Sequence, residues 1–356
     1  MSAVWGDKIK ITIFGESHSE AIGVVIDNLP SGIVLDFDEI KREMARRAPN
    51  GGEFSTPRKE SDEVEIVSGY FDGKTTGTPL CGIIRNTNTK SKDYSLLKDV
   101  FRPGHSDYGY YLKSEGNNDY RGGGHSSGRL TAPLVFCGAI CKQLLREKGI
   151  SIGSHIQSIA DVKDNSFGVA IDGSQLENLS KEVFPLLDKS KFEDMRKIIA
   201  NAREQGDSVG GVIECAVSGL QGGVGEPFFD SIESRLASLL FSVPAVKGVQ
   251  FGKGYELATM KGSEANDPFE FVDGKVVTKT NNNGGILGGI STGMPIVFNV
   301  AIKPTASIFK EQDSVNIKTK ENTRLTIQGR HDSCIVVRAI PVIEAVAAIA
   351  IYDFLR

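Results

Sequence analysis

The order of apolar and polar residues predicts a series of β-strands separated by turns. Most apolar runs are short, and they are flanked by Gly, Asn or Asp, which favour turns. Several runs alternate apolar with polar residues, as antiparallel strands with one buried face do. The predicted strands cover residues 10–14, 23–27, 63–68, 81–85, 152–160, 211–218, 295–302 and 334–338.

A second pattern, with apolar residues three and four positions apart, predicts amphipathic helices. In one of them, Ile232, Leu236 and Leu239 fall on a single face. The segment 262–283 is polar and rich in Asn, which predicts a mobile loop. Strands and helices together predict an α+β fold. The predicted helices cover residues 36–47, 130–148, 188–204, 228–241 and 340–355.

Two parts of the chain repeat the same order of motifs. Gly-Val-Val-Ile at 23–26 precedes Phe-Asp-Glu-Ile at 37–40, and Gly-Val-Ile-Glu at 211–214 precedes Phe-Asp-Ser-Ile at 229–232. A Thr-Gly-x-Pro motif then leads into a strand in each part. We therefore expect residues 1–356 to form one pseudo-symmetric domain, with an internal duplication of roughly 10–90 and 205–305. The alternative is chance similarity between common loop residues.

The composition is that of an ordinary globular protein. Of 356 residues, 40% are hydrophobic and 24% are charged, and the net charge is −4. A broad basic surface for nucleic acid is not expected, so any site for anions must be local. The most apolar stretch, 339–352, is too short to span a membrane and contains Glu344. The five cysteines form no Cys-x-x-Cys pair, which predicts reduced thiols in a cytoplasmic protein.

Histidines mark the candidate chemistry. Four of the five lie in glycine-flanked polar clusters: His18 in 15–19, His105 in 102–107, His125 in 121–129 and His331 in 329–332. Glycine allows close approach to a ligand, arginine binds oxyanions, and histidine transfers protons near neutral pH. This grouping predicts a site for an anionic ligand that undergoes proton chemistry.

The strongest local signal is the cluster 121–129. Three consecutive glycines precede Ser126 and Ser127, and Arg129 adjoins the start of a predicted helix. Backbone N–H groups at a helix start, with nearby hydroxyls and arginines, bind anions. The cluster lacks the Gly-Lys-Ser/Thr of a Walker A loop and does not follow a strand as a dinucleotide-binding loop does. A glycine-rich turn that only caps a helix is the alternative.

Further candidates lie near strand and helix ends. Lys303 with Thr305 offers a cation and a hydroxyl for a phosphate, and Asp332 is a candidate base near Arg338. A metal site is not expected, because no pair of histidines has ligand spacing. Nor is a serine hydrolase expected, because no candidate serine lies in Gly-x-Ser-x-Gly.

Several motifs in the same order resemble the chorismate synthase family over nearly the whole chain. They are Phe-Gly-Glu-Ser-His at 14–18, Phe-Arg-Pro-Gly-His at 101–105, Asp-Tyr-Arg-Gly-Gly-Gly at 119–124, Ser-Ser-Gly-Arg at 126–129, Gly-Gly-Ile-Leu-Gly-Gly at 284–289, Lys-Pro-Thr at 303–305 and Arg-His-Asp at 330–332. The chain departs from the family pattern at Ser19, Asn28, Ala48, Asn50, Glu53, His125 and Leu130.

The resemblance implies a β-α-β sandwich, a homotetramer and bound reduced FMN, with NADPH as a possible source of reducing equivalents. It implies the last step of the shikimate pathway. In that step 5-enolpyruvylshikimate 3-phosphate loses phosphate and a ring proton, in an anti-1,4 elimination that gives chorismate without net redox change. A flavin reductase or flavin carrier without lyase activity, or a non-catalytic phosphate-binding protein, are the alternatives.

Residue roles follow from the same resemblance. His18 is implied as proton donor to the leaving phosphate and His105 as proton donor to the reduced flavin, with Asp332 and Ser17 relaying the ring proton. The residues implied to bind substrate are Arg46, Arg47, Arg129, Arg338 and Ser127. Those implied to bind the flavin are His125, Ser126, Ser127, Pro244, Ala245, Gly288, Lys303, Pro304, Thr305, Ala306, Ser307 and Arg330.

Overall fold

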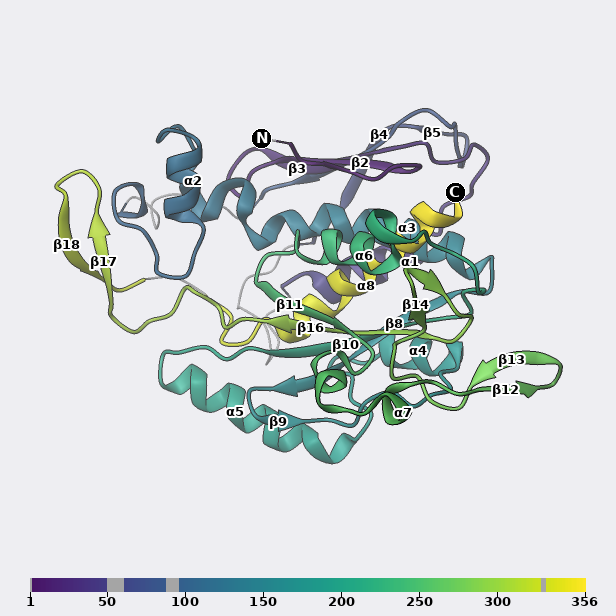
Figure 1. The fold of residues 1–356 in the computed structure, drawn as a ribbon. Coiled ribbons are helices and arrows are strands. Elements are labelled where there is room, and N and C mark those ends of the chain that lie inside the picture. The colour runs from purple at the N-terminus through teal and green to yellow at the C-terminus, as the bar shows by residue number, and fades with distance from the viewer. Residues whose placement is uncertain (1, 50–60, 88–95, 328–330) are drawn as a thin grey trace.

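Two antiparallel sheets enclose a layer of helices (Figure 1). The computed structural model describes residues 2–49, 61–87, 96–327 and 331–356. The inner layer consists of α1 (Phe37–Arg47), α3 (Thr131–Arg146), α6 (Ile232–Leu240) and α8 (Val336–Leu355). On the outer side of the second sheet lie α4 (Gly173–Ser180) and α5 (Phe192–Glu204). The predicted α+β class and sandwich layering are confirmed.

Each sheet has five strands. The first has the order β1-β2-β3-β7-β4, formed by β1 (Val4–Trp5), β2 (Lys10–Gly15), β3 (Ala21–Asp27), β4 (Val64–Ser68) and β7 (Leu80–Arg85). The second has the order β11-β16-β10-β8-β9, formed by β8 (Ser151–Ile159), β9 (Val162–Lys163), β10 (Gly211–Ser218), β11 (Val246–Phe251) and β16 (Ile296–Ile302).

The two sheets share one topology. In the first, the chain runs β2, β3, α1, β4 and β7, and the strands lie in the order β2-β3-β7-β4. In the second, it runs β8, β10, α6, β11 and β16, and the strands lie in the order β8-β10-β16-β11. The similar motifs at 23–26 and 211–214 fall on β3 and β10, which occupy corresponding places.

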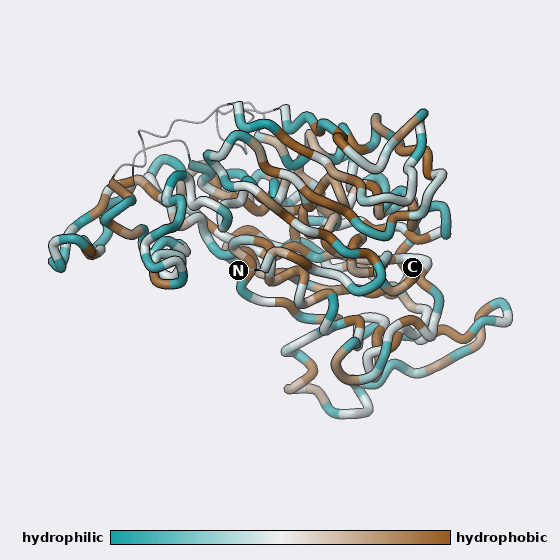
Figure 2. The backbone as a smooth tube through the Cα atoms, turned by 90° about the horizontal axis from the view of Figure 1, so that it is seen from above, coloured by the Kyte–Doolittle hydropathy of each residue, from teal (hydrophilic) through white to brown (hydrophobic). Residues whose placement is uncertain are grey.

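Small hairpins and short helices project from this body or edge it. They are β5–β6 (Tyr70–Phe71, Lys74–Thr75), β12–β13 (Phe269–Val272, Lys275–Thr278), β14–β15 (Ile286–Leu287, Ile290–Ser291), β17–β18 (Gln312–Asn316, Glu321–Leu325), α2 (Asp107–Lys113) and α7 (Gly262–Ala265). Hydrophobic segments run mainly through the body, whereas many outer turns are hydrophilic (Figure 2).

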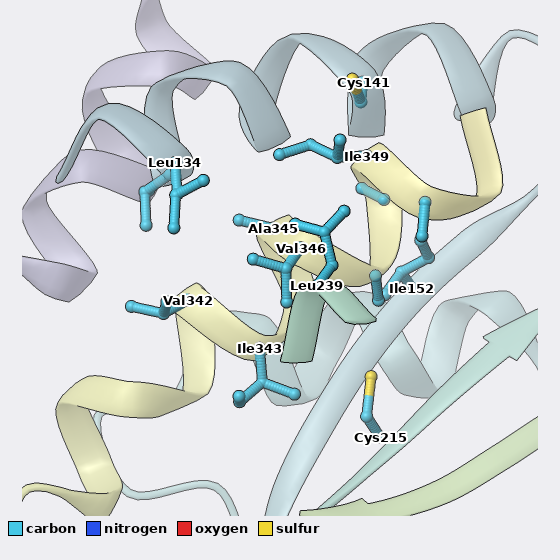
Figure 3. Close-up of a cluster of buried hydrophobic side chains, with 14 of the residues drawn as sticks. Leu134, Cys141, Ile152, Cys215, Leu239, Val342, Ile343, Ala345, Val346 and Ile349 are labelled. Carbon is cyan, nitrogen blue, oxygen red and sulfur yellow. The ribbon is translucent and has the colours of Figure 1, made fainter. Parts of the chain in front are cut away.

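Helix α8 is the centre of the core. Its side chains are buried on nearly every side, from Val336 to Asp353, as expected for a helix enclosed by other elements. Figure 3 shows its residues packed among α3, α6 and the second sheet. A Cβ on Gly138 of α3 would lie 2.3 Å from the Cβ of Ala345. The missing side chain therefore lets α3 and α8 approach closely.

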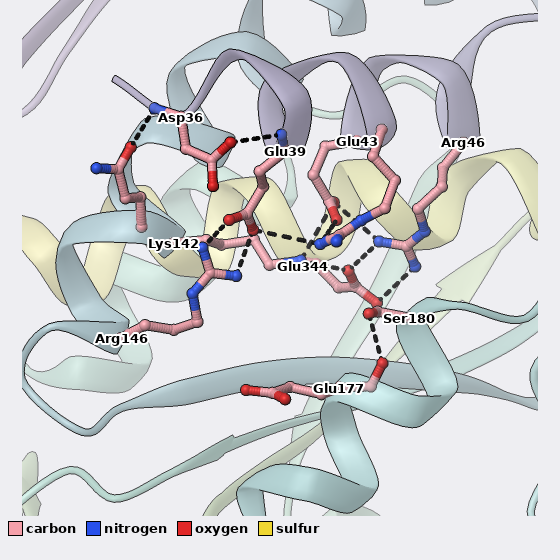
Figure 4. A network of polar contacts seen from close by, with 11 residues as sticks. Asp36, Glu39, Glu43, Arg46, Lys142, Arg146, Glu177, Ser180 and Glu344 are labelled. Atoms are coloured by element: carbon pink, nitrogen blue, oxygen red, sulfur yellow. Dashed lines mark hydrogen bonds and ion pairs between the residues drawn. The ribbon is translucent and has the colours of Figure 1, made fainter. Parts of the chain in front are cut away.

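A buried ion cluster joins α1, α3 and α8 (Figure 4). Glu344 accepts hydrogen bonds from Arg46 at 2.6 and 3.0 Å and from Lys142 at 2.9 Å. Both cations also contact Glu43, at 2.8 and 3.2 Å. Burial opposes ionisation of Glu43, but the charges of Lys142 and Arg46 lower its pKa to about 2. The helices are thus joined by mutually paired charges inside an apolar layer.

Most predicted elements are confirmed within a few residues, but the strand predicted at 334–338 is wrong. Residues from Val336 onward are the first turns of α8, which continues through Pro341. The β-branched residues in this stretch favour a strand locally. Val336 and Ile340 instead pack in the core between the sheets, and this burial outweighs their local preference.

The mobile loop predicted at 262–283 is also wrong, because the segment holds α7 and the β12–β13 hairpin. Asp273 and Gly274 between these strands both have positive φ, 49° and 75°. An Asp-Gly pair of this kind makes the tight turn that joins two strands. Asp267 accepts hydrogen bonds from the backbone of Asn282 and Asn283 at 2.7 and 3.0 Å, which fixes the Asn-rich end.

All five cysteines are free thiols, and four of them are buried. Among the helices of the described residues, none combines the length and apolar composition that a membrane span needs.

A buried histidine holds the second sheet to its neighbouring loops. His155 on β8 lies with Nδ1 3.0 Å from Asp164 and Nε2 2.8 Å from Glu214, and its side chain has no exposed surface. Both ring nitrogens can donate only when the ring is protonated. Burial opposes the charge, but hydrogen bonds to Asp164 and Glu214 raise the pKa of His155.

We predict that His155→Gln lowers the free energy of unfolding by about 3 kcal/mol, because it leaves two buried carboxylates without their cation. The raised pKa makes the contribution of His155 fully present below the unfolded pKa, about 6.5, and lost as pH rises through the folded-state pKa. Denaturant unfolding should therefore show a larger loss at about pH 6 than at about pH 9. Lys163→Gln, on exposed β9, is the control; an equal loss at both pH values would contradict the assignment.

Candidate active site

A cavity of about 950 Å³ is lined by segments from both halves of the chain. The first half contributes β2 and the loop after it, the end of α1 and the two histidine loops that precede α3. The second half contributes the segments 241–247, 303–307 and 331–342. The predicted site residues in its lining are Ser17, His18, Arg47, His105, His125, Ser126, Ser127, Arg129, Pro244, Ala245, Lys303, Pro304, Thr305, Ala306, Ser307, Asp332 and Arg338.

The glycines of the 121–129 cluster separate two histidines. A Cβ on Gly122 would lie 2.5 Å from Cε1 of His18 and 2.8 Å from Oγ of Ser17. A Cβ on Gly123 would lie 2.9 Å from Cε1 of His105. Both glycines have positive φ, 60° and 88°, which side chains other than glycine rarely adopt. Two consecutive glycines therefore bring His18 and His105 to the same short piece of backbone.

His105 is held by its own loop. Its Nδ1 lies 2.6 Å from Oδ1 of Asp107, whose carboxylate also accepts from Nε and Nη2 of Arg102 at 2.8 and 2.7 Å. Burial opposes ionisation of Asp107, but hydrogen bonds from Arg102 and His105 hold its pKa well below the ordinary range. The arginine also donates to the hydroxyl of Ser307 at 3.3 Å.

Two of the predicted substrate arginines share one buried carboxylate. Nη1 of Arg47 and Nη1 of Arg129 each form an ion pair with Asp62, whose side chain is fully buried. Nε of Arg129 donates to Asn86 at 3.1 Å, and Nε of Arg47 donates to Thr131 at 3.2 Å. Asp62 therefore fixes the two guanidinium groups side by side at the cavity wall.

The third predicted substrate arginine has a carboxylate of its own. Nη1 of Arg338 donates to Oδ2 of Asp332 at 2.6 Å, and its Nε donates to the carbonyl of Arg47 at 3.1 Å. The other carboxylate oxygen of Asp332 is buried and has no hydrogen-bond partner among the described residues. Arg338 lies on the first turn of α8, so the start of that helix brings the Asp332–Arg338 pair to the cavity.

Lysines and a strained turn mark another part of the lining. Burial, with a contribution from the nearby charge of Lys247, lowers the pKa of Lys303. The Oγ1 atom of Thr305 is buried without a partner among the described residues. Ala245 has a φ of 75°, and its carbonyl accepts from the backbone of Lys303 at 2.9 Å. A buried hydroxyl without a partner and a strained backbone are typical of a ligand site.

Some departures from the family pattern have a structural role here. The hydroxyl of Ser19 lies 3.0 Å from the backbone nitrogen of Glu16 and 2.9 Å from its carbonyl, so it closes the loop that carries His18. Nδ1 of His125 lies 2.7 Å from the carbonyl of Gly15. Asn28 has a φ of 64°, a conformation that asparagine tolerates better than most residues.

Two predicted site residues within the described part of the chain, Arg46 and Gly288, do not line the cavity. Arg46 lies in the buried ion cluster with Glu344, because the turn of α1 directs adjacent arginines to different faces. Gly288 lies exposed in the β14–β15 hairpin, and a Cβ there would meet nothing within 4 Å. Arg330, like Asn50 and Glu53, lies outside the described residues.

Sequence reasoning did not name as site residues several side chains that line the cavity. Arg102 was noted only as a neighbour of His105, and Asn86, Thr131 and Lys247 gave no motif signal. The single tryptophan, Trp5, also lines the cavity and lies under Arg235, whose Cζ is 4.6 Å from the ring centroid. Sequence reasoning also did not predict Asp62 as a site residue, because a single acidic residue just before a predicted strand is a weak indication of a functional role.

Comparison with known proteins places the chain in one family. The family model described as chorismate synthase matches residues 9–355. A chorismate synthase of Methanosarcina barkeri is 45% identical over 350 residues, which cover 98% of this chain and 95% of the relative. One of Thermococcus kodakarensis is 46% identical over 351 residues, 98% and 96% of the two chains. A crystal structure of a chorismate synthase superposes with a TM-score of 0.76 at 28% identity, over 99% of this chain and 92% of that one.

We predict that Gly122→Ala lowers the free energy of unfolding by at least about 1–2 kcal/mol, because alanine resists a positive φ. The added methyl also overlaps His18, so the ring resonances of that histidine should shift. Thermal unfolding and histidine NMR measure the two effects. Gly109→Ala on α2, where a Cβ meets nothing within 4 Å, is the control and should keep wild-type stability. Wild-type behaviour of Gly122→Ala would contradict the close packing.

Proposed function

The chain belongs to the chorismate synthase family of lyases, and we propose that it converts 5-enolpyruvylshikimate 3-phosphate to chorismate by anti-1,4 elimination. The observation that carries the proposal is the pair His18 and His105. They pack against adjacent glycines of one loop, in a cavity whose four lining arginines are each paired with an aspartate. A reaction that moves protons next to a phosphate needs both kinds of group in one place.

The arginines suit a substrate with two carboxylates and a phosphate. Arg47 and Arg129 both form ion pairs with Asp62, whereas Arg338 comes from the second half of the chain and pairs with Asp332. Guanidinium groups suit such a substrate because they carry a fixed positive charge and planar N–H donors that match carboxylate and phosphate oxygens. Ser127 lines the same wall and adds a hydroxyl. Arg46 is left out of this proposal because it is committed to Glu344.

The lining also fits a bound flavin mononucleotide. Lys303, Lys247 and the unpaired hydroxyl of Thr305 form a set of donors suited to its phosphate. Burial and the charge of Lys247 both lower the pKa of Lys303, and a bound phosphate would offset the second of these effects. The chemistry that reduced FMN would supply when bound is transient electron density for the loss of phosphate, without net redox change. The strained Ala245 and the hydroxyl of Ser126 line the same cavity.

The proton-transfer residues act from two sides of the glycine loop. His18 would give a proton to the departing phosphate, and Ser17 lies next to it against Gly122. His105 would hold the proton that compensates the charge of the reduced flavin. Asp332 accepts from Arg338 through one carboxylate oxygen, and its other oxygen has no partner among the described residues, so that second oxygen can accept a proton while the hydrogen bond from Arg338 is kept.

A flavin reductase or carrier without lyase activity is not favoured. Such a protein needs cations for the flavin phosphate, which the lysines supply. It does not need three further arginines in the same cavity. NADPH remains a proposed source of reducing equivalents only.

We further propose a cytoplasmic homotetramer built from an internally duplicated chain. The projecting β12–β13 hairpin exposes Phe269 and Phe271 by 65% and 80%, and such side chains are typical of subunit contacts. The common strand order of the two sheets supports the duplication. On that topology the second unit begins at β8, upstream of the start at about 205 that the sequence motifs suggest.

The central test is an anaerobic assay with chemically reduced FMN and 5-enolpyruvylshikimate 3-phosphate. We expect chorismate and phosphate in equal amounts, no turnover with oxidised flavin, and no consumption of NADPH once the flavin is reduced. NADPH oxidation in step with product, or flavin reduction without chorismate, would point to a reductase and overturn the proposal.

We also predict that His18→Ala and His105→Ala each reduce kcat by roughly 10²-fold or more, the usual contribution of a general acid or base. Both variants should fold, which circular dichroism and thermal unfolding check. Arg121→Ala is the control: Arg121 belongs to the same loop but pairs with Asp119 and is not in the cavity lining. Near-normal turnover in both histidine variants would remove the proton-transfer roles.

A further inference from the structure

Asp107, which is not among the predicted site residues, directly contacts a catalytic candidate. It is the first residue of α2, and its carboxylate is 2.6 Å from Nδ1 of His105. We infer that Asp107 is a positioning residue that fixes the proton of His105 on Nδ1 and so leaves Nε2 as the nitrogen that exchanges protons with the ligand. This role rests on the proposed function of His105.

The charges around the ring decide which nitrogen carries the proton. Three hydrogen bonds from Arg102, through its backbone nitrogen, Nε and Nη2 at 3.1, 2.8 and 2.7 Å, keep the carboxylate ionised. An anion 2.6 Å from a ring nitrogen is stable only when that nitrogen carries a hydrogen. Nη2 of Arg102 also lies 3.1 Å from Nδ1, but a protonated Nδ1 has no lone pair to accept from it. The full negative charge of the Asp107 carboxylate therefore favours the form of His105 that carries its hydrogen on Nδ1.

The carboxylate is rigid enough to orient the ring. Side chains of Arg102 and Asp107 are only 5% and 9% exposed, and Arg102 is further tied to Ser307 at 3.3 Å. On the other side of the ring, Gly123 leaves no room for a side chain between its backbone and the imidazole. The ring is thus held between a carboxylate at Nδ1 and a glycine near Nε2.

The ring nitrogen of His105 that remains available for proton transfer is Nε2. Nε2 has no hydrogen-bond partner among the described residues, although the ring lines the cavity and is 20% exposed. In the neutral ring Nε2 carries the lone pair, and in the protonated ring it carries the hydrogen that can be transferred. The Nδ1 proton stays directed at Asp107 in both states. A histidine oriented through one nitrogen by a carboxylate acts through the other.

Asp107→Asn tests the role, because an amide can donate to Nδ1 and so favour the opposite tautomer. In ligand-free protein labelled with ¹⁵N at histidine, His105 in its neutral form should change from N–H at Nδ1 to N–H at Nε2; His105→Gln identifies its signals. We expect kcat to fall by roughly 10²–10⁴-fold, as for other carboxylates that orient a histidine, with the substrate KM changed by less than about threefold. Asp107→Glu, which keeps the carboxylate, should restore the Nδ1–H tautomer and part of kcat.

Asp172→Asn is the matched control, since it removes a carboxylate at the start of α4, outside the cavity lining. It should leave both the tautomer and kcat unchanged. An unchanged tautomer in Asp107→Asn, or normal kcat despite a changed tautomer, would overturn the inference. If wild-type protein makes no chorismate while the tautomer still changes in Asp107→Asn, the proposed function fails and the contact between Asp107 and His105 stands.

Discussion

The cavity concentrates arginine side chains, and the repulsion between them is the constraint that the surrounding structure must satisfy. Each arginine in its lining has an aspartate behind it: Asp62 serves Arg47 and Arg129, while Arg338 and Arg102 have Asp332 and Asp107. A buried cation without such a partner would cost several kcal/mol. The aspartates offset much of this positive charge, and because Asp62 is shared by two arginines the wall keeps a net positive charge. The cavity can therefore remain polar and cationic without a ligand to hold it together.

The same pairing gives the site its shape. The carboxylate partners come from the segment just before β4, the start of α2 and the segment before α8, so each ion pair joins elements distant in the sequence or fixes a loop against a helix. The glycines of the 121–129 cluster act in the opposite way, because they leave out side chains where two histidines must approach. Attraction between charges and the absence of Cβ atoms together set which groups face the ligand. Neither would hold the geometry without the helix layer beneath.

That layer explains why loops from both halves meet. Helix α8 is buried between the two sheets on nearly all sides, and its first turn carries Arg338 to the cavity. The cluster of Glu43, Arg46, Lys142 and Glu344 fixes α1 and α3 against it. The end of α1 then carries Arg47, and the segment just before α3 carries Arg129. Two neighbouring arginines of one helix thus serve different purposes, one inside the ion cluster and one at the cavity.

The sequence by itself determined most strands of both sheets, the four inner helices and the loops that carry His18, His105 and His125, because these depend on local periodicity and glycine-rich motifs. It also determined the family, through motifs whose order extends over the chain. Only the tertiary structure decided that Arg46 pairs with Glu344, that Asp62 holds two arginines and that Val336 begins a helix rather than ending a strand. These outcomes depend on contacts between residues far apart in the chain. A local pattern cannot encode them, since the free energy of burying a charge or a valine is set by whatever packs against it.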